Sequence, residues 1–226
     1  MTSSDRLLVW TGGGVFVGSL VICAYSYIVS WAVPREIDWP AGGFDAVVFS
    51  VFALHHSLFA RTRVKERLAR LIPPHLLRSV YVWIASLLLI AVCVVWQPVG
   101  GLWYRHAGGI AAAHFAIQLL GLGIVAQSVR AIDPLELAGI RSQSTTARLQ
   151  MAGPYRLVRH PLYLGWILIV FGAARMTGDR LVFAAITTLY LAAAIPWEEA
   201  SLHAAFGSDY ERYRRHVRWR MIPFIY

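Results

Sequence analysis

The sequence has 226 residues, of which 58% are hydrophobic and only 15% are charged, and its formal net charge is +9. Soluble domains carry about 25% charged residues, so this composition excludes an ordinary soluble domain and indicates an integral membrane protein. The basic residues lie between apolar segments and not in one continuous run. Membrane orientation explains them more simply than nucleic-acid binding does, and we expect a lipid bilayer and no nucleic acid as partner.

Six apolar segments approach the ~20 residues that a membrane-spanning helix needs. In chain order they are Leu7–Val33, Phe44–Ala60, Leu77–Trp96, Gly109–Val129, Pro161–Thr177 and Leu181–Trp197. The last two are short and closely spaced, which predicts a tight helical hairpin that barely crosses the hydrocarbon. We therefore predict an all-α, polytopic membrane bundle of about six transmembrane helices. Residues 1–226 are expected to form a single domain, with three helices in 1–108 and a ligand-binding half in 109–226.

The basic residues are divided unequally between the two sides of this bundle. The loops on one side hold four of them, Arg35, Arg105, Arg175 and Arg180, and the other side holds the remaining 17 of the 21 Lys and Arg. The positive-inside rule then predicts that both termini are cytoplasmic. The tail Glu198–Arg220 has apolar residues at three- and four-residue steps, interrupted at Gly207, and predicts an interfacial amphipathic helix.

Five side chains inside the apolar segments have alternative interpretations. Cys23 and Cys93 have no partner motif nearby, so we expect reduced packing residues and no metal site. His55, His56 and His114 are candidates for haem or metal ligation or for a proton relay. The alternative is that these imidazoles form hydrogen bonds to neighbouring helices.

The stretch Gly153–Gly165 combines a polar turn, a basic cluster and the start of an apolar helix. Pro161 suits the first helical turn, which places Arg159 and His160 at or just before a helix N-terminus. Cations gain nothing from the helix dipole at that end, but they make sense if an anion docks there. The alternative interpretation is a positive anchor at the membrane boundary.

Two further pairs of residues extend this candidate site. Glu198 and Glu199 follow an apolar segment directly; one could meet Arg159 or Arg156 while the other accepts from a ligand. Gly121 and Gly123 would allow close approach of a flat ligand or of a second helix. Cations, carboxylates and a wall of small residues together suit a zwitterionic, ribose-bearing cofactor.

These motifs resemble a known superfamily. Gly153–Gly165, the pair Glu198-Glu199 and the pattern from Leu202 to Tyr213 are similar to the isoprenylcysteine carboxyl methyltransferases and phospholipid methyltransferases. In the N-terminal half, Leu54–Arg61 and Arg78–Val82 more loosely resemble the bacterial branch with methanethiol S-methyltransferases and NnrU-type proteins. The resemblance implies methyl transfer from S-adenosylmethionine (SAM) in a pocket within a bacterial inner membrane. It also implies a small thiol or a lipophilic thiol, carboxylate or lipid as acceptor.

The resemblance also assigns roles to individual residues. It implies that Arg159, His160 and Glu199 are catalytic. It further implies that the cofactor is bound by Gly121, Gly123, Tyr155, Arg159, His160, Tyr163, Gly165, Glu198 and Glu199. Leu162 stands where several relatives have Ser, a departure that leaves the cofactor assignment unchanged.

Two other functions compete with the methyltransferase. One is a haem- or redox-associated membrane protein that uses the histidines inside the apolar segments. The other is an NADPH-binding protein similar to membrane sterol reductases, although only the general excess of arginine would serve a 2′-phosphate.

Overall fold

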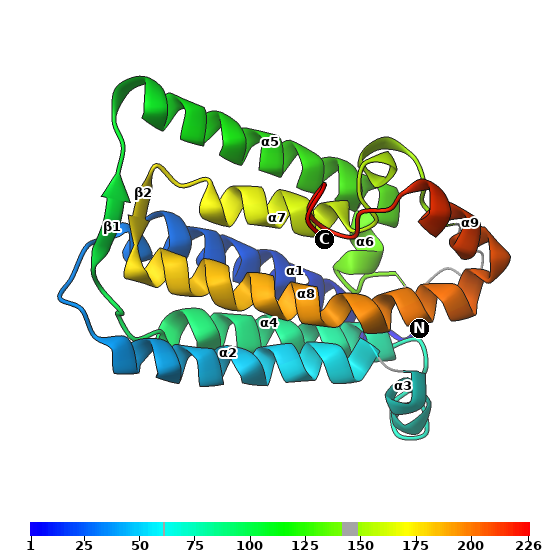
Figure 1. Ribbon diagram of the computed structural model, residues 1–226. Helices are drawn as coiled ribbons and strands as arrows, with labels where there is room; N and C mark the ends of the chain where they lie inside the picture. Colours follow the sequence, from blue (N-terminus) through cyan, green and yellow to red (C-terminus); the bar gives the residue numbers. More distant parts are fainter. Residues whose placement is uncertain (61, 142–148) are drawn as a thin grey trace. The chain divides into compact units, whose positions relative to one another are not determined.

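The computed structural model describes residues 1–60, 62–141 and 149–226. Figure 1 labels the helices and strands of the chain, which divides into two compact units. The first comprises Met1–Gly101 with Asp133–Thr145, and the second comprises Leu102–Ile132 with Thr146–Tyr226. Arg61 and Arg148, both counted in the charge asymmetry, and the Ser/Thr/Gln-rich stretch 142–148 lie outside the described residues.

The first unit is helical. Its helices are α1 (Ser3–Ile28), the 3₁₀ turn η1 (Ser30–Ala32), α2 (Trp39–Ala60), α3 (Thr62–Leu68), α4 (Leu77–Val95) and α6 (Pro134–Leu137). A capping box starts α1, because the Thr2 side chain accepts from the Asp5 N–H and the Asp5 carboxylate accepts from the Thr2 N–H.

Helices α1 and α4 of the first unit pack through small residues. A Cβ added at Gly12 would lie 2.6 Å from Nε1 of Trp83, so the glycine admits the indole, which donates to the Leu8 carbonyl at 2.9 Å. The Ser79 hydroxyl donates to the Gly139 carbonyl at 2.6 Å and ties α4 to the turn after α6. Neutral hydrogen bonds and close backbone approach therefore hold this part of the unit together.

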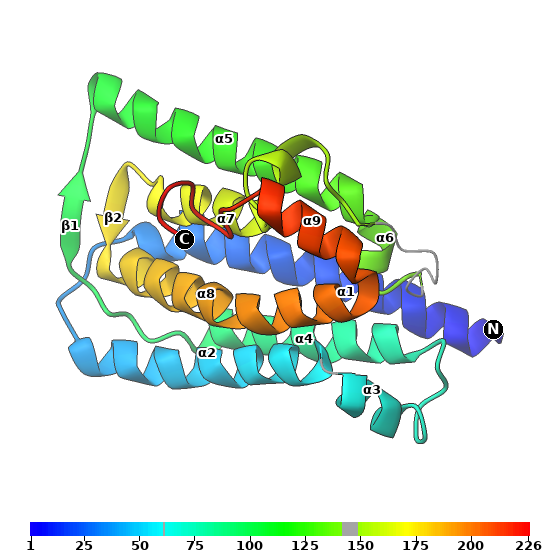
Figure 2. The same cartoon turned by 45° about the vertical axis from the view of Figure 1, so that its right-hand side comes forward.

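The second unit contains the candidate site. Its elements are β1 (Leu102–Arg105), α5 (Gly108–Ile132), the 3₁₀ turn η2 (Gly153–Arg156), α7 (Pro161–Phe171), β2 (Arg175–Thr177), α8 (Gly178–Phe206) and α9 (Ser208–His216). The strands β1 and β2 pair antiparallel, a small sheet that the all-α prediction did not include. Because β1 leads into α5 and β2 leads into α8, the antiparallel pairing places the starts of these two long helices on the same side of the unit, at opposite ends of the two-stranded ladder (Figures 1 and 2).

Five helices of the described chain are long and apolar enough to cross a membrane, and the predicted helical membrane bundle is confirmed. The fifth predicted segment differs from the others, because α7 has only 11 residues. At 1.5 Å per residue it is about 16 Å long, roughly half of a hydrocarbon core. The expectation of about six spans is therefore corrected to five long helices and one short apolar helix.

The start of α7 and the course of α8 position the acidic and basic residues. His160 is the N-cap residue of α7 and Pro161 its first residue, as the sequence predicted. Helix α8 does not end at Trp197 but continues to Phe206, so Glu198 and Glu199 lie inside a helix and not in a tail after it. The predicted interruption at Gly207 is confirmed, since this residue has a φ of 51° and separates α8 from α9.

Candidate functional site

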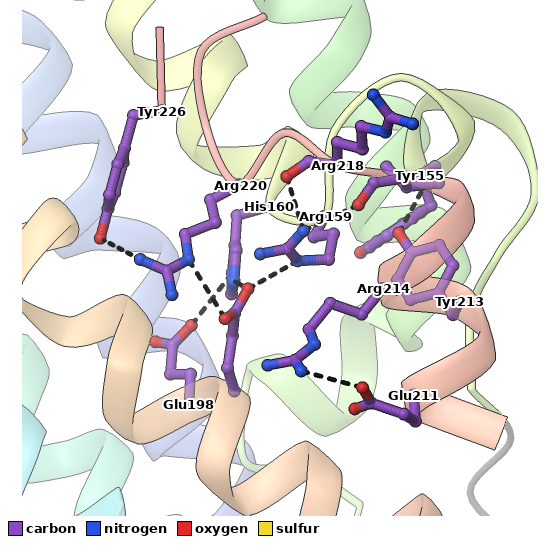
Figure 3. A network of polar contacts seen from close by, with 12 residues as sticks. Tyr155, Arg159, His160, Glu198, Glu211, Tyr213, Arg214, Arg218, Arg220 and Tyr226 are labelled. Carbon is purple, nitrogen blue, oxygen red and sulfur yellow. Dashed lines mark hydrogen bonds and ion pairs between the residues drawn. The ribbon is translucent and has the colours of Figure 1, made fainter. Parts of the chain in front are cut away.

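Three segments far apart in the sequence bring charged side chains together in the second unit (Figure 3). They are the pair Arg159-His160 before α7, the pair Glu198-Glu199 in α8, and the tail Val217–Tyr226 after α9. We call this group of residues the charged cluster. All three segments contribute hydrogen bonds or ion pairs to it, so the cluster exists only when the unit is folded.

Arg159 is buried and engaged on two sides. Its Nε donates to Oε1 of Glu199 at 2.6 Å, and its Nη1 donates to the carbonyls of Val217 and Arg218 at 2.7 and 2.8 Å. Only 6% of its side chain is exposed. This arginine therefore ties α8 to the tail as well as supplying positive charge.

Glu199 is the acidic centre of the cluster. Besides Arg159, its Oε1 lies 3.6 Å from Nε2 of His160, and its Oε2 lies 3.3 Å from Nε of Arg220. Its side chain is 8% exposed. A buried carboxylate is costly without compensating partners, and three basic side chains compensate this one. The sequence-based expectation that one of the two glutamates meets Arg159 is confirmed for Glu199.

Glu198 has a more open environment than its neighbour. Its carboxylate accepts a hydrogen bond from the Tyr163 hydroxyl and lies 3.3 Å from Nδ1 of His160. The rings of His160 and Tyr163 are stacked, with centroids 5.3 Å apart. The Glu198 side chain is 35% exposed, so it can reach a ligand that the buried Glu199 cannot.

The tail pairs with the segment before α7 through its backbone. The Arg159 N–H donates to the Trp219 carbonyl at 2.9 Å, and the His160 N–H donates to the Arg220 carbonyl at 2.8 Å. These bonds satisfy two backbone donors just before the helix start, where no intrahelical partner exists. Both views of the unit show the tail beside the first turn of α7 (Figures 1 and 2).

Tyr155 lies behind the cluster. Its carbonyl accepts from the Tyr213 hydroxyl at 2.7 Å, and its side chain packs against the buried residues Tyr210, Tyr213 and Val217. Burial raises the pKa of Tyr155 and that of Tyr213, so both phenols stay neutral. The structure thus gives Tyr155 a packing role that anchors α9, whereas cofactor binding by this residue stays a prediction.

The charges of the cluster perturb nearby titrations. Burial alone lowers the pKa of His160, but its interactions with the Glu198 and Glu199 carboxylates outweigh burial and raise the pKa above its ordinary 6.5. Burial and the negative charge of Glu199 raise the pKa of Tyr210 to about 12. The Tyr210 hydroxyl is buried and has no hydrogen-bond partner in the described part of the chain.

Two predicted glycines lie in a helix–helix contact. A Cβ added at Gly121 of α5 would lie 2.6 Å from the Gly165 carbonyl oxygen, and one added at Gly165 of α7 would lie 2.7 Å from the Gly121 carbonyl oxygen. The two helices therefore approach backbone to backbone at this point. At Gly123 an added Cβ would meet no described atom within 4 Å, so this position is open. Cofactor binding by these glycines stays a prediction.

The contacts of His55, His56 and His114 are with residues outside the charged cluster. His56 shares a hydrogen bond with the Tyr81 hydroxyl, and Nδ1 of His114 lies 3.2 Å from the Gly172 carbonyl oxygen. His55 packs against Phe59 with ring centroids 4.4 Å apart. No group of three or more potential metal ligands is present within the described ranges. The contacts of His56 and His114 match the hydrogen-bonding interpretation of these residues.

Arg220 and the tail that carries it were not among the residues that the sequence predicted for the site. Arg220 was counted only as one of many basic residues on the positive side of the bundle. Arg220 follows the predicted amphipathic helix after only a few residues, which was the one signal that it could lie near the glutamates. Nothing in the sequence indicated that the tail folds back to Glu199.

Comparison with known proteins identifies the family. Residues 111–209 match the model of the phospholipid methyltransferase family. The methanethiol S-methyltransferase of Crocosphaera subtropica is 34% identical over 224 residues, which cover 91% of this chain and 88% of that protein. The corresponding enzyme of Mycobacterium tuberculosis is 32% identical over 216 residues, which cover 87% and 88% of the two chains.

A more distant relative covers only part of the chain. The probable protein-S-isoprenylcysteine O-methyltransferase of Oryza sativa subsp. indica is 37% identical over 76 residues, 32% of this chain and 39% of that protein. No solved structure matches. The long matches confirm the first of the three predicted functions: the chain belongs to the methanethiol S-methyltransferase family and is a membrane-embedded enzyme that uses SAM as methyl donor.

Proposed function

We propose that the protein transfers the methyl group of SAM to methanethiol. The observation that carries this acceptor is the similarity to proteins named methanethiol S-methyltransferase over about nine-tenths of the chain. In the reaction, the thiol loses its proton to solvent and its sulfur forms a new bond to the methyl carbon. The bond between that carbon and the sulfonium breaks, and dimethyl sulfide and S-adenosylhomocysteine are released.

The charged cluster is proposed to hold the cofactor. When bound, SAM supplies a methyl group already activated by the positive sulfonium, so the protein has to position the reactants and exclude water. Glu198, with Tyr163 and His160 beside it, is the candidate partner for the cofactor's ammonium or ribose hydroxyls. The fit rests on the exposure of the Glu198 carboxylate, on the His160 imidazole beside it, and on Arg220, which pairs with the neighbouring Glu199.

Arg159, His160 and Glu199 were predicted to be catalytic, and we propose that they act by fixing the cluster. Glu199 is held by Arg159, His160 and Arg220, so its negative charge is compensated inside the protein. The three basic side chains carry more positive charge than the Glu199 carboxylate neutralises. This excess positive charge stabilises a thiolate acceptor and lowers the thiol pKa. A fixed cluster therefore favours the reactive form of the acceptor without a dedicated base.

We further propose that both termini face the cytoplasm of a bacterial inner membrane, as the charge asymmetry predicts. The cluster then lies at the cytoplasmic side, where SAM is available. A C-terminal fusion to green fluorescent protein should fluoresce, whereas a C-terminal alkaline phosphatase fusion should be inactive. The reverse pair of results would contradict this orientation.

The acceptor is tested with the detergent-purified protein. Three parallel reactions each contain the enzyme, SAM and one acceptor. The acceptors are methanethiol, N-acetyl-S-farnesylcysteine and phosphatidylethanolamine vesicles. Dimethyl sulfide in the headspace of the first reaction, with no methylated product in the other two, is the expected result. Methylation of the prenylated acid or the phospholipid without dimethyl sulfide would replace methanethiol by that acceptor.

A further inference from the structure

Arg220 has a combination of contacts and exposure that separates it from Arg159. Its Nε lies 3.3 Å from Oε2 of Glu199, and its Nη1 donates to the Tyr226 hydroxyl at 3.0 Å. The guanidinium also lies over the Tyr226 ring, 5.2 Å from its centroid. The side chain is 34% exposed, against 6% for Arg159, although both arginines contact the same carboxylate.

The two arginines therefore differ in what they can offer a ligand. Arg159 gives its Nε to Glu199 and its Nη1 to two backbone carbonyls, which consumes much of its donor capacity inside the protein. The hydrogen bond and ion pair of Arg220 use Nε and Nη1, and Nη2 donates to no described residue. A guanidinium with a free edge can pair with a carboxylate from outside.

Glu199 and Tyr226 fix the direction of that edge. Figure 3 shows the Arg220 guanidinium between the glutamates of α8 and Tyr226, with dashed contacts on both sides. The tail holds the guanidinium there by folding back on itself: the main-chain oxygen of Tyr226 accepts from the N–H groups of Arg220, Met221 and Ile222. A guanidinium held at two points loses little further freedom when a ligand binds.

We propose that Arg220, and not Arg159, binds the carboxylate of the methionine part of SAM, and that Arg159 positions Glu199. Among the described arginines that form an ion pair with the glutamates of α8, Arg220 is the partly exposed one, and Glu198 is the more exposed of the two carboxylates. An amino-acid zwitterion presents the complementary pair of charges. This inference rests on the cofactor site proposed above. It assigns the specificity for a carboxylate-bearing methyl donor to the tail.

The test compares SAM with decarboxylated SAM, which has the same sulfonium, adenosine and amine but lacks the carboxylate. Binding of both compounds to the full-length, detergent-purified protein is measured by isothermal titration calorimetry. The wild type is expected to bind SAM about 10- to 100-fold more tightly, as one charge-assisted pair would give. Arg220→Gln should weaken SAM binding by that factor and change binding of the decarboxylated compound less than about 3-fold.

Two further variants show whether a change in SAM affinity comes from a lost contact to the carboxylate or from a disturbed cluster. Arg215→Gln removes an arginine of α9 whose exposed side chain makes no hydrogen bond or ion pair to a described residue, and it should keep the preference for SAM. Arg159→Gln should weaken both compounds to a similar extent, because it disturbs Glu199. Unchanged binding of the decarboxylated compound by Arg220→Gln also demonstrates that this variant is folded.

Three results would overturn the proposal. Arg220→Gln could weaken both compounds equally, which would make Arg220 a structural residue, or it could retain the full preference for SAM. A wild-type protein that binds SAM with no preference over the decarboxylated compound would equally refute it. A wild type that binds neither compound would contradict the cofactor site itself, a different outcome from a failure of the Arg220 assignment.

Discussion

The two units stabilise their helices by different means. In the first, Gly12 admits the Trp83 indole, and the Ser79 hydroxyl bonds a backbone carbonyl, so close approach and neutral hydrogen bonds are used. In the second, Glu199 is buried among Arg159, His160 and Arg220. Ion pairs of this kind are expensive to desolvate and seldom improve stability over apolar packing. The difference therefore indicates that the second unit is built for binding as well as for packing.

Replacing Glu199 should have the largest effect. Glu199→Gln leaves the buried Arg159 without its carboxylate partner, which costs about 3–5 kcal/mol of unfolding free energy when a buried pair is broken. We expect a large drop in the melting temperature of the detergent-solubilised protein and loss of SAM binding. Glu211→Gln removes partly exposed contacts with Arg214 on α9 and with His203 and should change neither property. Equal melting curves for both variants would refute the central role of Glu199.

A methyl group at Gly121 should be the next most damaging change. In Gly121→Ala the new Cβ would approach the Gly165 carbonyl oxygen at 2.6 Å, so α5 and α7 must separate, at a cost of about 1–3 kcal/mol. Gly123→Ala meets no described atom within 4 Å and should keep or slightly raise the melting temperature. If Gly123 also lines the cofactor site, as the sequence predicts, the same variant will bind SAM more weakly while remaining stable.

Glu198→Gln should separate binding from stability. The side chain is 35% exposed, and the amide can still accept from the Tyr163 hydroxyl, so we expect a melting temperature close to that of the wild type. SAM affinity should fall about 10- to 100-fold because a charged partner is lost. Calorimetric titration and a thermal melt of the same preparation check this. A variant that melts much earlier would make Glu198 as structural as Glu199.

The pH dependence should reveal His160. Its pKa is raised in the folded protein, so protonated His160 stabilises the cluster below the unfolded value near 6.5. That contribution is lost as pH rises through the folded pKa. We expect the melting temperature to decline over that interval in the wild type and to decline less in His160→Gln. Identical pH profiles for the two proteins would show that His160 does not titrate as proposed.

The smallest effect is expected from histidines outside the cluster. His114→Phe removes one contact to the Gly172 carbonyl, worth about 1 kcal/mol, and should leave SAM affinity unchanged. His56→Phe should behave similarly, since its partner is the Tyr81 hydroxyl. Absorption spectra of the purified proteins test the haem alternative at the same time. A Soret band that disappears in either variant would restore that alternative.

Most residues of the cluster could be predicted from the sequence, but their burial and their individual partners could not. Pro161 after Arg159-His160 marked a helix start, and adjacent carboxylates beside an apolar segment marked a functional pair. Nothing local could distinguish Glu198 from Glu199, because their different burial depends on which side of α8 faces the tail. The same limit hid Arg220, whose partner lies 21 residues earlier in another element (220 − 199).

The length of the fifth apolar segment is a second feature that the sequence did not predict correctly. Hydropathy located all six apolar segments, because the free energy of transfer into lipid depends mainly on the local composition of a segment. It overestimated the fifth, since Gly172 ends α7 and the following residues enter the strand β2. The pairing of β2 with β1 is a contact between segments far apart in the sequence, and no local pattern in Arg175–Thr177 predicted it.

The sequence by itself thus determined the membrane class, the apolar segments and the family, because these depend on composition and on short motifs. Only the tertiary structure decided which charges meet: it buried Glu199 among three basic residues, left Glu198 accessible and returned the tail so that Arg220 joins them. The physical reason is that ion pairing in a buried cluster falls off with distance in space, and spacing along the chain does not set that distance.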